Sequence, residues 1–422
     1  MREMKDSGIE WIGEIPADWT LQRGKTIFAQ RLTKGNQSEI LLAATQKYGM
    51  LPQSEVEGVV QVKEDADLQQ FRTVHKKDFV ISLRSFQGGF EYSQYEGVCS
   101  PAYQVFYNTN PICHNYYRLL FKSDGFIQKM NSMTVGIREG KNIQYSDFAN
   151  SLIPVPPINQ QQRIADYLDR KCSKIDAIIA RQQEVIEKLK AYKLSVITEA
   201  VTKGLNPNVP MKDSGVEWIG EIPEHWSIVP LTKQLESIVD YRGKTPEKVD
   251  DGIFLVTARN IKNGMIDYSI SSEYVKAEDY NEIMRRGIPQ IGDVLFTTEA
   301  PLGQVANVDR TDIALAQRII KFSTKKHLDS YFLKYWIMSI GFQNFLMTLS
   351  TGSTAVGIKA SKLFMLPVPL VPMQEQNQIV TYLDKKCKRI ESVIDRKQAL
   401  IDKFTDYKKS LIYETVTGKK EV

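Results

Sequence analysis

The heptad-patterned stretch from Gln160 to Lys203 constrains the fold of this chain more than any other feature. Apolar residues recur there at alternating spacings of three and four, which predicts one continuous helix of the coiled-coil kind. The same pattern returns once in the chain, with Ile164 matched by Ile379 at a separation of 379 − 164 = 215 residues. Two long helices that share one pattern predict two halves of a duplicated structure.

The predicted seam of the two helices is a set of apolar residues at matching heights in both halves. It consists of Leu168, Cys172, Ile175, Ile179, Ile186, Leu189, Val196, Leu383, Cys387, Ile390, Ile394, Ile401, Phe404 and Leu411. The polar interruptions also recur, as Gln182 and Lys193 in the first helix and as Lys397 and Lys408 in the second. Tyr192 with Lys193 and Tyr407 with Lys408 recur together at matching heights, which supports a docking face for a partner.

A second repeat supports the duplication. The segment from Met4 to Pro16 returns as Met211 to Pro223 with one replacement, and Trp19 is matched by Trp226. Glycine and proline at fixed places predict an extended, turned segment. We expect this segment, called the clasp here, to be structural, with its tryptophans docked as apolar anchors.

The composition is that of a soluble globular protein. The chain has 422 residues, of which 42% are hydrophobic and 25% are charged, so we expect two to four domains. No apolar run approaches the roughly 18 residues of a membrane span, and the start lacks a signal peptide, so we expect a cytoplasmic protein without membrane contact. The net charge of +5 is mild and supports nucleic-acid binding only weakly.

Catalytic and metal-binding motifs are not evident. The cysteines and histidines lack ligand spacing, so we expect the cysteines to serve packing and expect no structural metal. Gly243-Lys244-Thr245 ends like a phosphate-binding loop, but Ile238 stands where the first glycine should be. Neither an Asn-Pro-Pro-aromatic tetrapeptide nor a convincing nuclease signature occurs.

The segments before each long helix predict two mixed domains with a common scaffold. Phe79 to Ser82 and Tyr103 to Tyr107 read as strands, and Tyr116 to Asn131 reads as one short helix. At the offset of 215, Asp293 to Thr297 aligns with Asp78 to Ser82, and Arg318 to Ile320 aligns with Tyr103 to Val105. Proline hinges close both domains and place the helix starts near Gln160 and Gln374.

The predicted fold class is therefore α+β. Two globular mixed α/β domains are joined by two long antiparallel coiled-coil helices with pseudo-two-fold symmetry. The expected parts are residues 1–20 (clasp), 21–153 (first domain), 154–210 (central helix and linker), 211–227 (repeated clasp), 228–366 (second domain) and 367–422 (C-terminal helix). A helix of about 40 residues spans roughly 60 Å, enough for both domains to reach one DNA duplex.

At this point a family resemblance is plain. The repeated Glu-Trp-Ile-Gly-Glu-Ile-Pro, the Pro-Val-Pro hinge followed by a glutamine-rich helix start, and Tyr-Leu-Asp-x-Lys-Cys at Tyr167 and Tyr382 are similar to the specificity subunit of type I restriction-modification systems. The resemblance covers essentially the whole chain. It implies a non-catalytic subunit whose two target-recognition domains each read one half of a bipartite, asymmetric site in double-stranded DNA.

The resemblance also implies partners and cofactors. The paired helices would set the spacer between the half-sites and dock two methyltransferase subunits, which in turn bring in the restriction and motor subunits. S-adenosylmethionine, ATP and Mg²⁺ would belong to these partners, and no cofactor is expected on this chain.

No family motif marks the base-reading residues, so the candidates are polar, basic and aromatic side chains on the expected loops. In the first domain they are Arg72, Lys76, Lys77, Arg84, Ser85, Gln87, Tyr92, Arg138, Lys141 and Asn142. In the second they are Tyr241, Arg242, Lys244, Thr245, Arg259, Asn260, Lys262, Asn263, Thr298, Gln317, Arg318 and Lys359.

Two other functions stay open on the residues alone. One is an adaptor whose two domains bind proteins, and the other is a single-chain enzyme that recognises and modifies DNA. A DNA reader should show steeply salt-dependent binding to duplex DNA, an adaptor should not, and only the enzyme should transfer methyl groups by itself.

Overall fold

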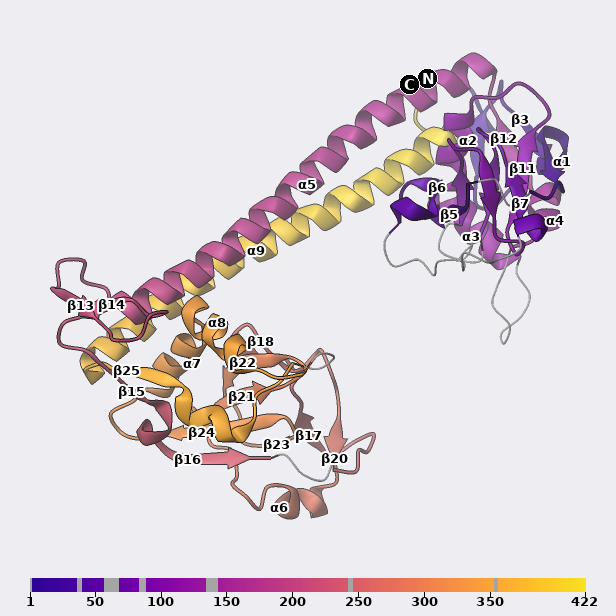
Figure 1. Cartoon of the computed structure of the whole chain (residues 1–422). Coiled ribbons are helices and arrows are strands. Elements are labelled where there is room, and N and C mark those ends of the chain that lie inside the picture. Colours follow the sequence, from indigo (N-terminus) through magenta and orange to yellow (C-terminus); the bar gives the residue numbers. More distant parts are fainter. Residues whose placement is uncertain are drawn as a thin grey trace. The chain divides into compact units, whose positions relative to one another are not determined.

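The computed structural model describes residues 2–35, 40–56, 68–82, 89–133, 143–241, 246–352 and 356–422 (Figure 1). It divides into two compact units, each considered by itself below. Unit 1 comprises Met1–Gln183 with Ala399–Val422, and unit 2 comprises Glu184–Gln398. Each unit therefore contains one recognition domain, one clasp and half of each long helix, α5 (Ile158–Lys203) and α9 (Met373–Val416).

The recognition domain of unit 1 is built from short strands followed by short helices. Its clasp holds β1 (Met4–Asp6) and β2 (Glu14–Pro16). The domain contains β3 (Thr20–Arg23), α1 (Gly24–Ile27), β4 (Phe28–Arg31), β5 (Leu42–Thr45), β6 (Gly49–Pro52), β7 (Arg72–Val74), β8 (Phe79–Ile81), β9 (Phe90–Tyr92), β10 (Gly97–Cys99), β11 (Gln104–Asn108), α2 (His114–Phe121), α3 (Asp124–Ser132), α4 (Tyr145–Asn150) and β12 (Leu152–Val155).

Unit 2 repeats this plan with additional strands. Its clasp holds β13 (Met211–Asp213) and β14 (Glu221–Pro223). The domain contains β15 (Ser227–Pro230), β16 (Leu235–Asp240), β17 (Ile253–Val256), β18 (Ile261–Lys262), β19 (Met265–Ile266), β20 (Tyr274–Val275), α6 (Tyr280–Ile283), β21 (Val294–Thr298), β22 (Leu302–Asn307), β23 (Ile313–Leu315), β24 (Ile319–Thr324), α7 (Ser330–Met338), α8 (Ile340–Leu349), the 3-10 helix η6 (Ala360–Met365) and β25 (Pro367–Leu370).

Both recognition domains are organised on the same four-stranded antiparallel sheet. Its order is β4-β11-β8-β9 in unit 1 and β16-β24-β21-β22 in unit 2. The predicted equivalence of β8 and β21 at the offset of 215 agrees with this order. The alignment of Arg318 with Tyr103 is wrong by one residue, because Gln104 pairs with Ile81 whereas Ile320 pairs with Phe296. One additional residue has entered unit 2 between the paired strands.

A buried aspartate fixes the turn before the central strand in both sheets. Asp78 accepts a hydrogen bond from the backbone N–H of His75 at 2.8 Å and forms an ion pair with Arg31 at 2.7 Å. Its equivalent Asp293 binds the backbone N–H of Gln290 at 2.9 Å and Lys321 at 2.8 Å. The aspartate is repeated, but its cationic partner lies on β4 in unit 1 and on β24 in unit 2. The ion pair offsets the free-energy cost of burying each carboxylate.

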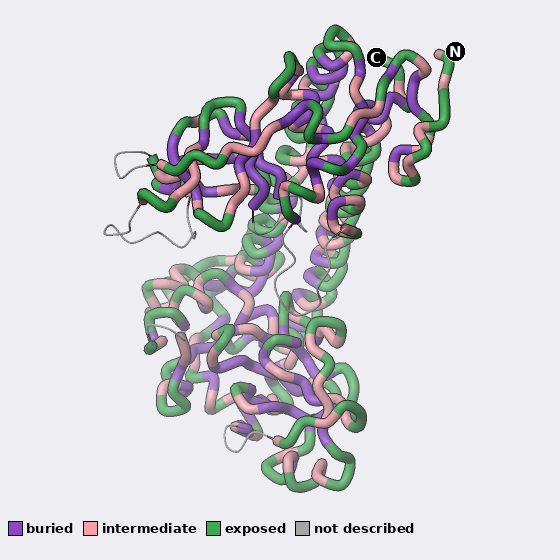
Figure 2. Tube along the Cα trace, turned by 90° about the vertical axis from the view of Figure 1, so that its right-hand side faces the viewer, coloured by how far each residue is buried: buried purple, intermediate pink, exposed green. Residues whose placement is uncertain are grey.

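The sheet of each unit packs against its helices through an apolar core. In unit 1 this core is aromatic, with Phe28, Phe79 and Phe106 in mutual contact at ring-centroid distances of 5.4–5.9 Å. In unit 2 the helix residues Phe332 and Trp336 are fully buried against the sheet. Figure 2 shows buried stretches inside both globular domains and at intervals along the long helices.

The predicted single helix from Tyr116 to Asn131 is two helices, α2 and α3. Ser123, in an extended backbone conformation, separates them, and its hydroxyl donates to the carbonyl of Leu120 at 2.7 Å. The break turns α3 toward the clasp, where a Cβ at Gly125 would lie 3.0 Å from the ring of Trp11. In unit 2 Gly341 of α8 lies against Trp218 in the same way.

The proline hinges form strands. β12 pairs with β3, and β25 pairs with β15, so each hinge closes its domain by joining the segment that follows the clasp. The prolines stand in two-stranded pairings, where an absent N–H is tolerated. The long helices begin at Ile158 and Met373, within two residues of the predicted starts.

Glutamines at the helix starts bind the recognition domains to the helices. Gln161 accepts from the backbone N–H of Cys113 at 2.9 Å, and its equivalent Gln376 accepts from that of Asp329 at 2.8 Å. Both side chains are nearly inaccessible to solvent, at 3% and 0% exposure. This explains the repeated glutamine-rich motif, because a buried amide with satisfied hydrogen bonds fixes the direction in which each helix leaves its domain.

The clasps contact the same helix starts. The indole N–H of Trp19 donates to Gln160 at 2.8 Å, and that of Trp226 donates to Glu375 at 3.0 Å. Both tryptophans are fully buried. The predicted structural role of the clasp agrees with these contacts.

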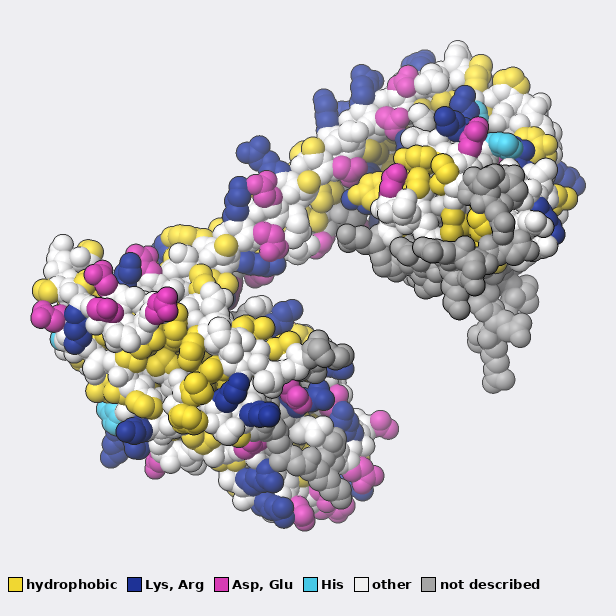
Figure 3. All heavy atoms as spheres, in the orientation of Figure 1, with side chains coloured by type: hydrophobic (Ala, Val, Ile, Leu, Met, Phe, Trp, Pro, Cys, Tyr) yellow, Lys and Arg dark blue, Asp and Glu magenta, His cyan; other side chains and the backbone are white. Residues whose placement is uncertain are grey.

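The helices α5 and α9 pack side by side in opposite directions (Figure 1). Every residue of the predicted seam is buried or half-buried, while charged side chains follow one another along the exposed surface (Figure 3). The polar interruptions at Lys193 and Lys408 are interhelical ion pairs. Lys193 binds Glu391 in unit 2, and Lys408 binds Asp176 at 2.6 Å in unit 1. Asp176 and Glu391 are themselves separated by 215 residues, so the pairs are equivalent.

The two ends of the chain lie together in unit 1. Arg2 and Glu3 line one cavity with Lys420, Glu421 and Val422. Gly418, just beyond α9, lies against the ring of Trp19, and in unit 2 Gly204, just beyond α5, lies against the ring of Trp226. The first clasp is therefore placed on the end of α9 as the second clasp is placed on the end of α5.

Of the helices formed by the described residues, none combines the length and the apolar character that a membrane crossing requires.

Candidate nucleic-acid interface

Basic side chains in unit 1 are presented by the turn between β7 and β8. Lys76 and Lys77 are exposed there, and Lys77 has a positive φ of 75°. Asp78 fixes the turn from below through its hydrogen bond to His75. Arg72, half-buried on β7, donates to the carbonyl of Leu32 at 3.4 Å. The turn is thus a rigid support for two cations that face solvent.

A basic cleft of about 180 Å³ lies in the recognition domain of unit 2. It is lined by the candidates Arg259, Gln317 and Arg318 together with Lys248, which sequence reasoning missed. Glu273 also lines it and forms an ion pair with Lys248 at 2.7 Å. Three cations line this cleft, two of them paired with the carboxylates of Glu273 and Glu299, so a net positive charge remains that favours a polyanion such as DNA.

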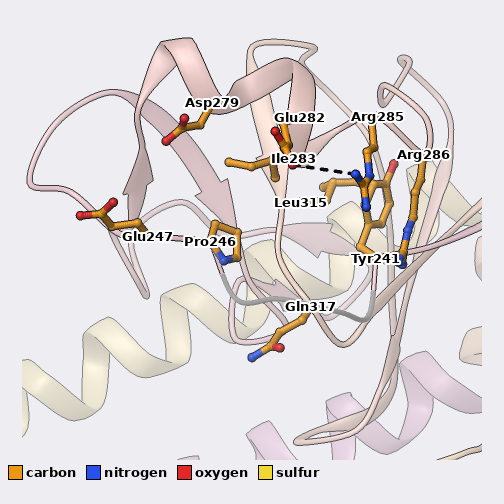
Figure 4. A pocket seen from close by; sticks show the side chains of 10 residues that line it. All are labelled: Tyr241, Pro246, Glu247, Asp279, Glu282, Ile283, Arg285, Arg286, Leu315 and Gln317. Atoms are coloured by element: carbon orange, nitrogen blue, oxygen red, sulfur yellow. Dashed lines mark ion pairs between the residues drawn. The ribbon is translucent and has the colours of Figure 1, made fainter.

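A larger cavity of about 620 Å³ shares Pro246 and Gln317 with the basic cleft (Figure 4). In Figure 4 the side chains of Arg285 and Arg286 gather beside Tyr241, while Glu247 and Asp279 lie on the other side. Burial raises the pKa of Tyr241, whose hydroxyl donates to the carbonyl of Gly287. Sequence reasoning also missed the two arginines, for which the adjacent Arg-Arg pair before a Gly-Ile-Pro turn was an available signal.

Several candidates are engaged inside the domains. Asn260 is fully buried and closes its own loop, accepting from Thr257 N–H and donating to Asp267 and Ser271 carbonyls at 2.9 Å. Thr298 is 1% exposed. Tyr92 packs on Phe79 in the aromatic core of unit 1. The structure places these side chains, and that of Tyr241, in structural positions rather than at a DNA-facing surface.

The remaining described candidates face solvent and stay predictions. Lys262 ends β18 and Asn263 begins the turn of the β18–β19 hairpin, where it has a φ of 55°. Lys359 precedes the 3-10 helix η6. The other candidates fall outside the described residues, namely Arg84, Ser85, Gln87, Arg138, Lys141, Asn142, Arg242, Lys244 and Thr245.

Titratable groups with ligand chemistry do not gather in the part of the chain that the structure describes. Among those residues no cluster of three or more His, Cys, Asp or Glu side chains could hold a metal ion. The four cysteines are free and buried, and burial raises the pKa of the Cys99 thiol to about 12. The Cys99 thiol is therefore neutral at physiological pH and packs as a small apolar group.

The exposed faces of the long helices carry repeated tyrosines. Tyr192 and Tyr407 are about half exposed, at 48% and 52%. The neighbouring Lys193 and Lys408 are used in the interhelical ion pairs, so the tyrosines and not the lysines remain as candidates for partner docking.

The duplicated scaffold, with a basic cleft in unit 2 and exposed cations in unit 1, defines a protein with two recognition domains suited to nucleic acid. Comparison with known families identifies the class of protein. Residues 4–188 and 230–401 match the type I restriction modification DNA specificity domain. The chain belongs to this family and is a specificity subunit, which is a DNA-recognition subunit rather than a catalytic one.

Relatives are similar along most of the chain. The MjaVIII specificity subunit of Methanocaldococcus jannaschii is 26% identical over 83% of this chain and 80% of its own length. The putative MjaX specificity subunit of the same organism is 25% identical over 97% and 96%. The EcoBI specificity subunit of Escherichia coli is 24% identical over 64% and 58%.

Solved structures show the same fold at low sequence identity. A chain from a study of complex assembly and conformational transition of the type I R-M system has a TM-score of 0.71 at 14% identity, and the match covers 96% of this chain and 99% of that one. The HsdS subunit from Thermoanaerobacter tengcongensis has a TM-score of 0.50 at 15% identity over 98% and 100%.

Proposed function

We propose that the two recognition domains each read one half of a bipartite, asymmetric sequence in double-stranded DNA. One observation carries the proposal: the two domains share a scaffold, but the segments that connect its strands differ between them. Gln161 and Gln376 hold equivalent positions and make equivalent bonds. The elements between the equivalent strands differ, with β5, β6 and β7 between β4 and β8 but β17 to β20 and α6 between β16 and β21, as expected of two domains that read different bases.

The long helices connect the two readers and dock two methyltransferase subunits, through which restriction and motor subunits join. The repeated Tyr192 and Tyr407 support this assignment, since equivalent exposed aromatics suit two copies of one partner. S-adenosylmethionine, ATP and Mg²⁺ belong to the partner subunits, and the complex acts in the cytoplasm.

Methylome sequencing tests the proposal. Cells that carry this chain with its methyltransferase partner should show a bipartite methylated motif, and deletion of this gene should remove it. Absence of a motif, with both proteins expressed and associated, would contradict the proposal and favour an adaptor.

A domain exchange tests the modular part. Replacing residues 21–151 by the corresponding domain of a relative should change one half of the motif and leave the other half intact. A change in both halves would contradict independent reading.

A further inference from the structure

Arg318 stands at a sharply turned point between β23 and β24. Its φ of 78° lies in the left-handed region that residues with side chains rarely adopt. Its carbonyl accepts hydrogen bonds from the N–H and hydroxyl of Thr298, at 2.9 and 3.2 Å. The arginine side chain therefore leaves from a fixed point of the central sheet.

Glu299 supports the guanidinium of Arg318 from one side. Its Oε1 lies 2.9 Å from Nε of Arg318, in an ion pair whose side chains are 38% and 47% exposed. Among the described residues the structure gives the two terminal nitrogens of Arg318 no partner. Because Glu299 engages the Nε side, the terminal fork of the guanidinium remains available for a ligand.

Glu299 itself is held closely. It follows β21 and forms a bridge with Gly357. A Cβ at Gly357 would lie 3.0 Å from Cβ of Glu299 and 3.1 Å from the carbonyl oxygen of Thr298. The missing side chain of Gly357 thus lets the backbone pack against Glu299 and fix its position.

The surroundings of Arg318 are basic and polar. Arg259, Gln317 and Lys248 line the same cleft, which favours a DNA backbone beside it. A terminal arginine fork matches the two acceptors, O6 and N7, that guanine presents in the major groove. A guanidinium held in a fixed orientation by Glu299 can select a base through two directed hydrogen bonds, whereas a phosphate contact requires only positive charge.

We propose that Arg318 reads one guanine in the half-site of the second recognition domain, with Glu299 as its positioning residue. The inference rests on the proposed function, in which this domain reads one half of the target. It adds the residue, the base and the reason why this arginine differs from its neighbours.

Substitutions of Arg318 test the inference in the complete complex. Arg318→Lys keeps the charge and loses the fork, and Arg318→Gly accepts the positive φ without strain. With either variant the methylated motif should lose its guanine requirement at one position. Discrimination at that position, measured by competition between duplexes, should fall about ten- to a hundred-fold. The other half of the motif should not change.

Arg310→Ala is the matched control. Arg310 is an exposed arginine of the same domain whose guanidinium is occupied side-on by Asp312, with Nε 2.6 Å from one carboxylate oxygen and Nη2 bonded to the other. Its fork is not free, so this substitution should leave the motif unchanged.

Glu299→Ala separates positioning from a structural role. Removing the carboxylate frees Arg318 to rotate and removes a negative charge from the cleft. Discrimination for guanine should fall while affinity for non-specific duplex rises, whereas loss of folding would lower both. Glu299→Gln, which keeps the shape and an acceptor for Nε, should retain most of the discrimination.

The outcomes separate the two proposals. If wild type yields no bipartite motif, the proposed function fails and this inference with it. If wild type yields the motif and Arg318→Lys leaves every position unchanged, or weakens all sequences equally, Arg318 is not a base reader and the inference is overturned.

Discussion

Glu91 is an acid that the first recognition domain buries at a cost. It lies on β9 with 1% exposure, and Lys122 approaches one carboxylate oxygen at 2.7 Å. Burial outweighs this ion pair and raises the pKa of Glu91 to about 7, from an ordinary value of 4.5. The folded domain therefore holds a proton that the unfolded chain has already released at mildly acidic pH.

This predicts a stability that falls as pH rises. Between about pH 4.5 and 7 the folded state binds more protons than the unfolded state, so stability decreases by up to about 1.4 kcal/mol per pH unit in that window. Denaturant unfolding of wild type at pH 5.5 and 8.0 should show the loss, and Glu91→Gln should flatten it. An equally steep profile in the variant would assign the effect to another group.

Gly341 offers a case in which two effects of known sign compete. Glycine to alanine inside a helix usually stabilises by about 0.5–1 kcal/mol. Here the new Cβ would lie 2.8 Å from the ring of Trp218, so the clasp must shift.

We expect Gly341→Ala to destabilise unit 2 by about 1–3 kcal/mol, because overpacking exceeds the helix preference. Thermal unfolding measures the loss. Trp218→Leu removes the ring, and in that background Gly341→Ala should stabilise unit 2, as glycine to alanine in a helix usually does. A stabilised single variant would show that the clasp adapts freely.

At the scale of elements, the long helices are fastened by repeated ion pairs within an apolar seam. Lys193 is 9% exposed and meets Glu391, and the equivalent Lys408 meets Asp176. A half-buried pair contributes more through register than through net stability, since desolvation offsets most of the attraction.

Breaking one pair should cost about 1 kcal/mol, because Glu391 is still one third exposed to water. Glu391→Lys opposes two lysines, and the additional Lys193→Glu should restore the stability by reversing the pair. Urea unfolding of both variants gives the coupling. If the double variant is no more stable than the single one, the pair does not act as a unit.

The elements that were predictable from the sequence are those with local periodicity. The heptads that contain Leu168 and Leu411 specify the two long helices through apolar neighbours three and four residues apart. The clasp repeat is visible as identical residues in the sequence. The partner of Lys193 lies 198 residues away, so the polar break was visible and its cause was not.

The candidate base-reading residues were less predictable for a related reason. Asn260 and Arg318 both read as polar loop residues, and nothing in their immediate neighbourhood distinguishes them. The side chain of Asn260 is hydrogen-bonded within its own loop, whereas Arg318 has a positive φ and its terminal guanidinium nitrogens face a potential ligand. That difference depends on backbone geometry, which the residue types do not encode locally.

At the scale of the whole molecule, the chain order is nearly cyclic. The start and end of the chain line one cavity in unit 1, and the segment between Gly204 and Met211 is largely exposed. Residues 2–3 and 420–422 thus lie in unit 1 at a place equivalent to that linker in unit 2.

A permuted chain that starts at Asn208 and ends at Pro207, with the original ends joined by about five flexible residues, should fold and retain its methylation motif. Thermal unfolding and methylome sequencing check this. A permuted chain opened between Val80 and Ile81, inside β8, is the control that should not fold. Failure of the first variant would show that the free ends are required.

The ion pairs of the long helices also bear on ancestry. Lys193 of α5 pairs with Glu391 of α9, and the equivalent Lys408 of α9 pairs with Asp176 of α5, the equivalent of Glu391. Such a reciprocal exchange of contacts is typical of a two-fold homodimer. A half-length protomer would have formed the same pair twice, and such a dimer could read only a palindrome. In a single polypeptide the two recognition domains can differ in sequence, so the proposed target can be asymmetric without any change in the helices that join them.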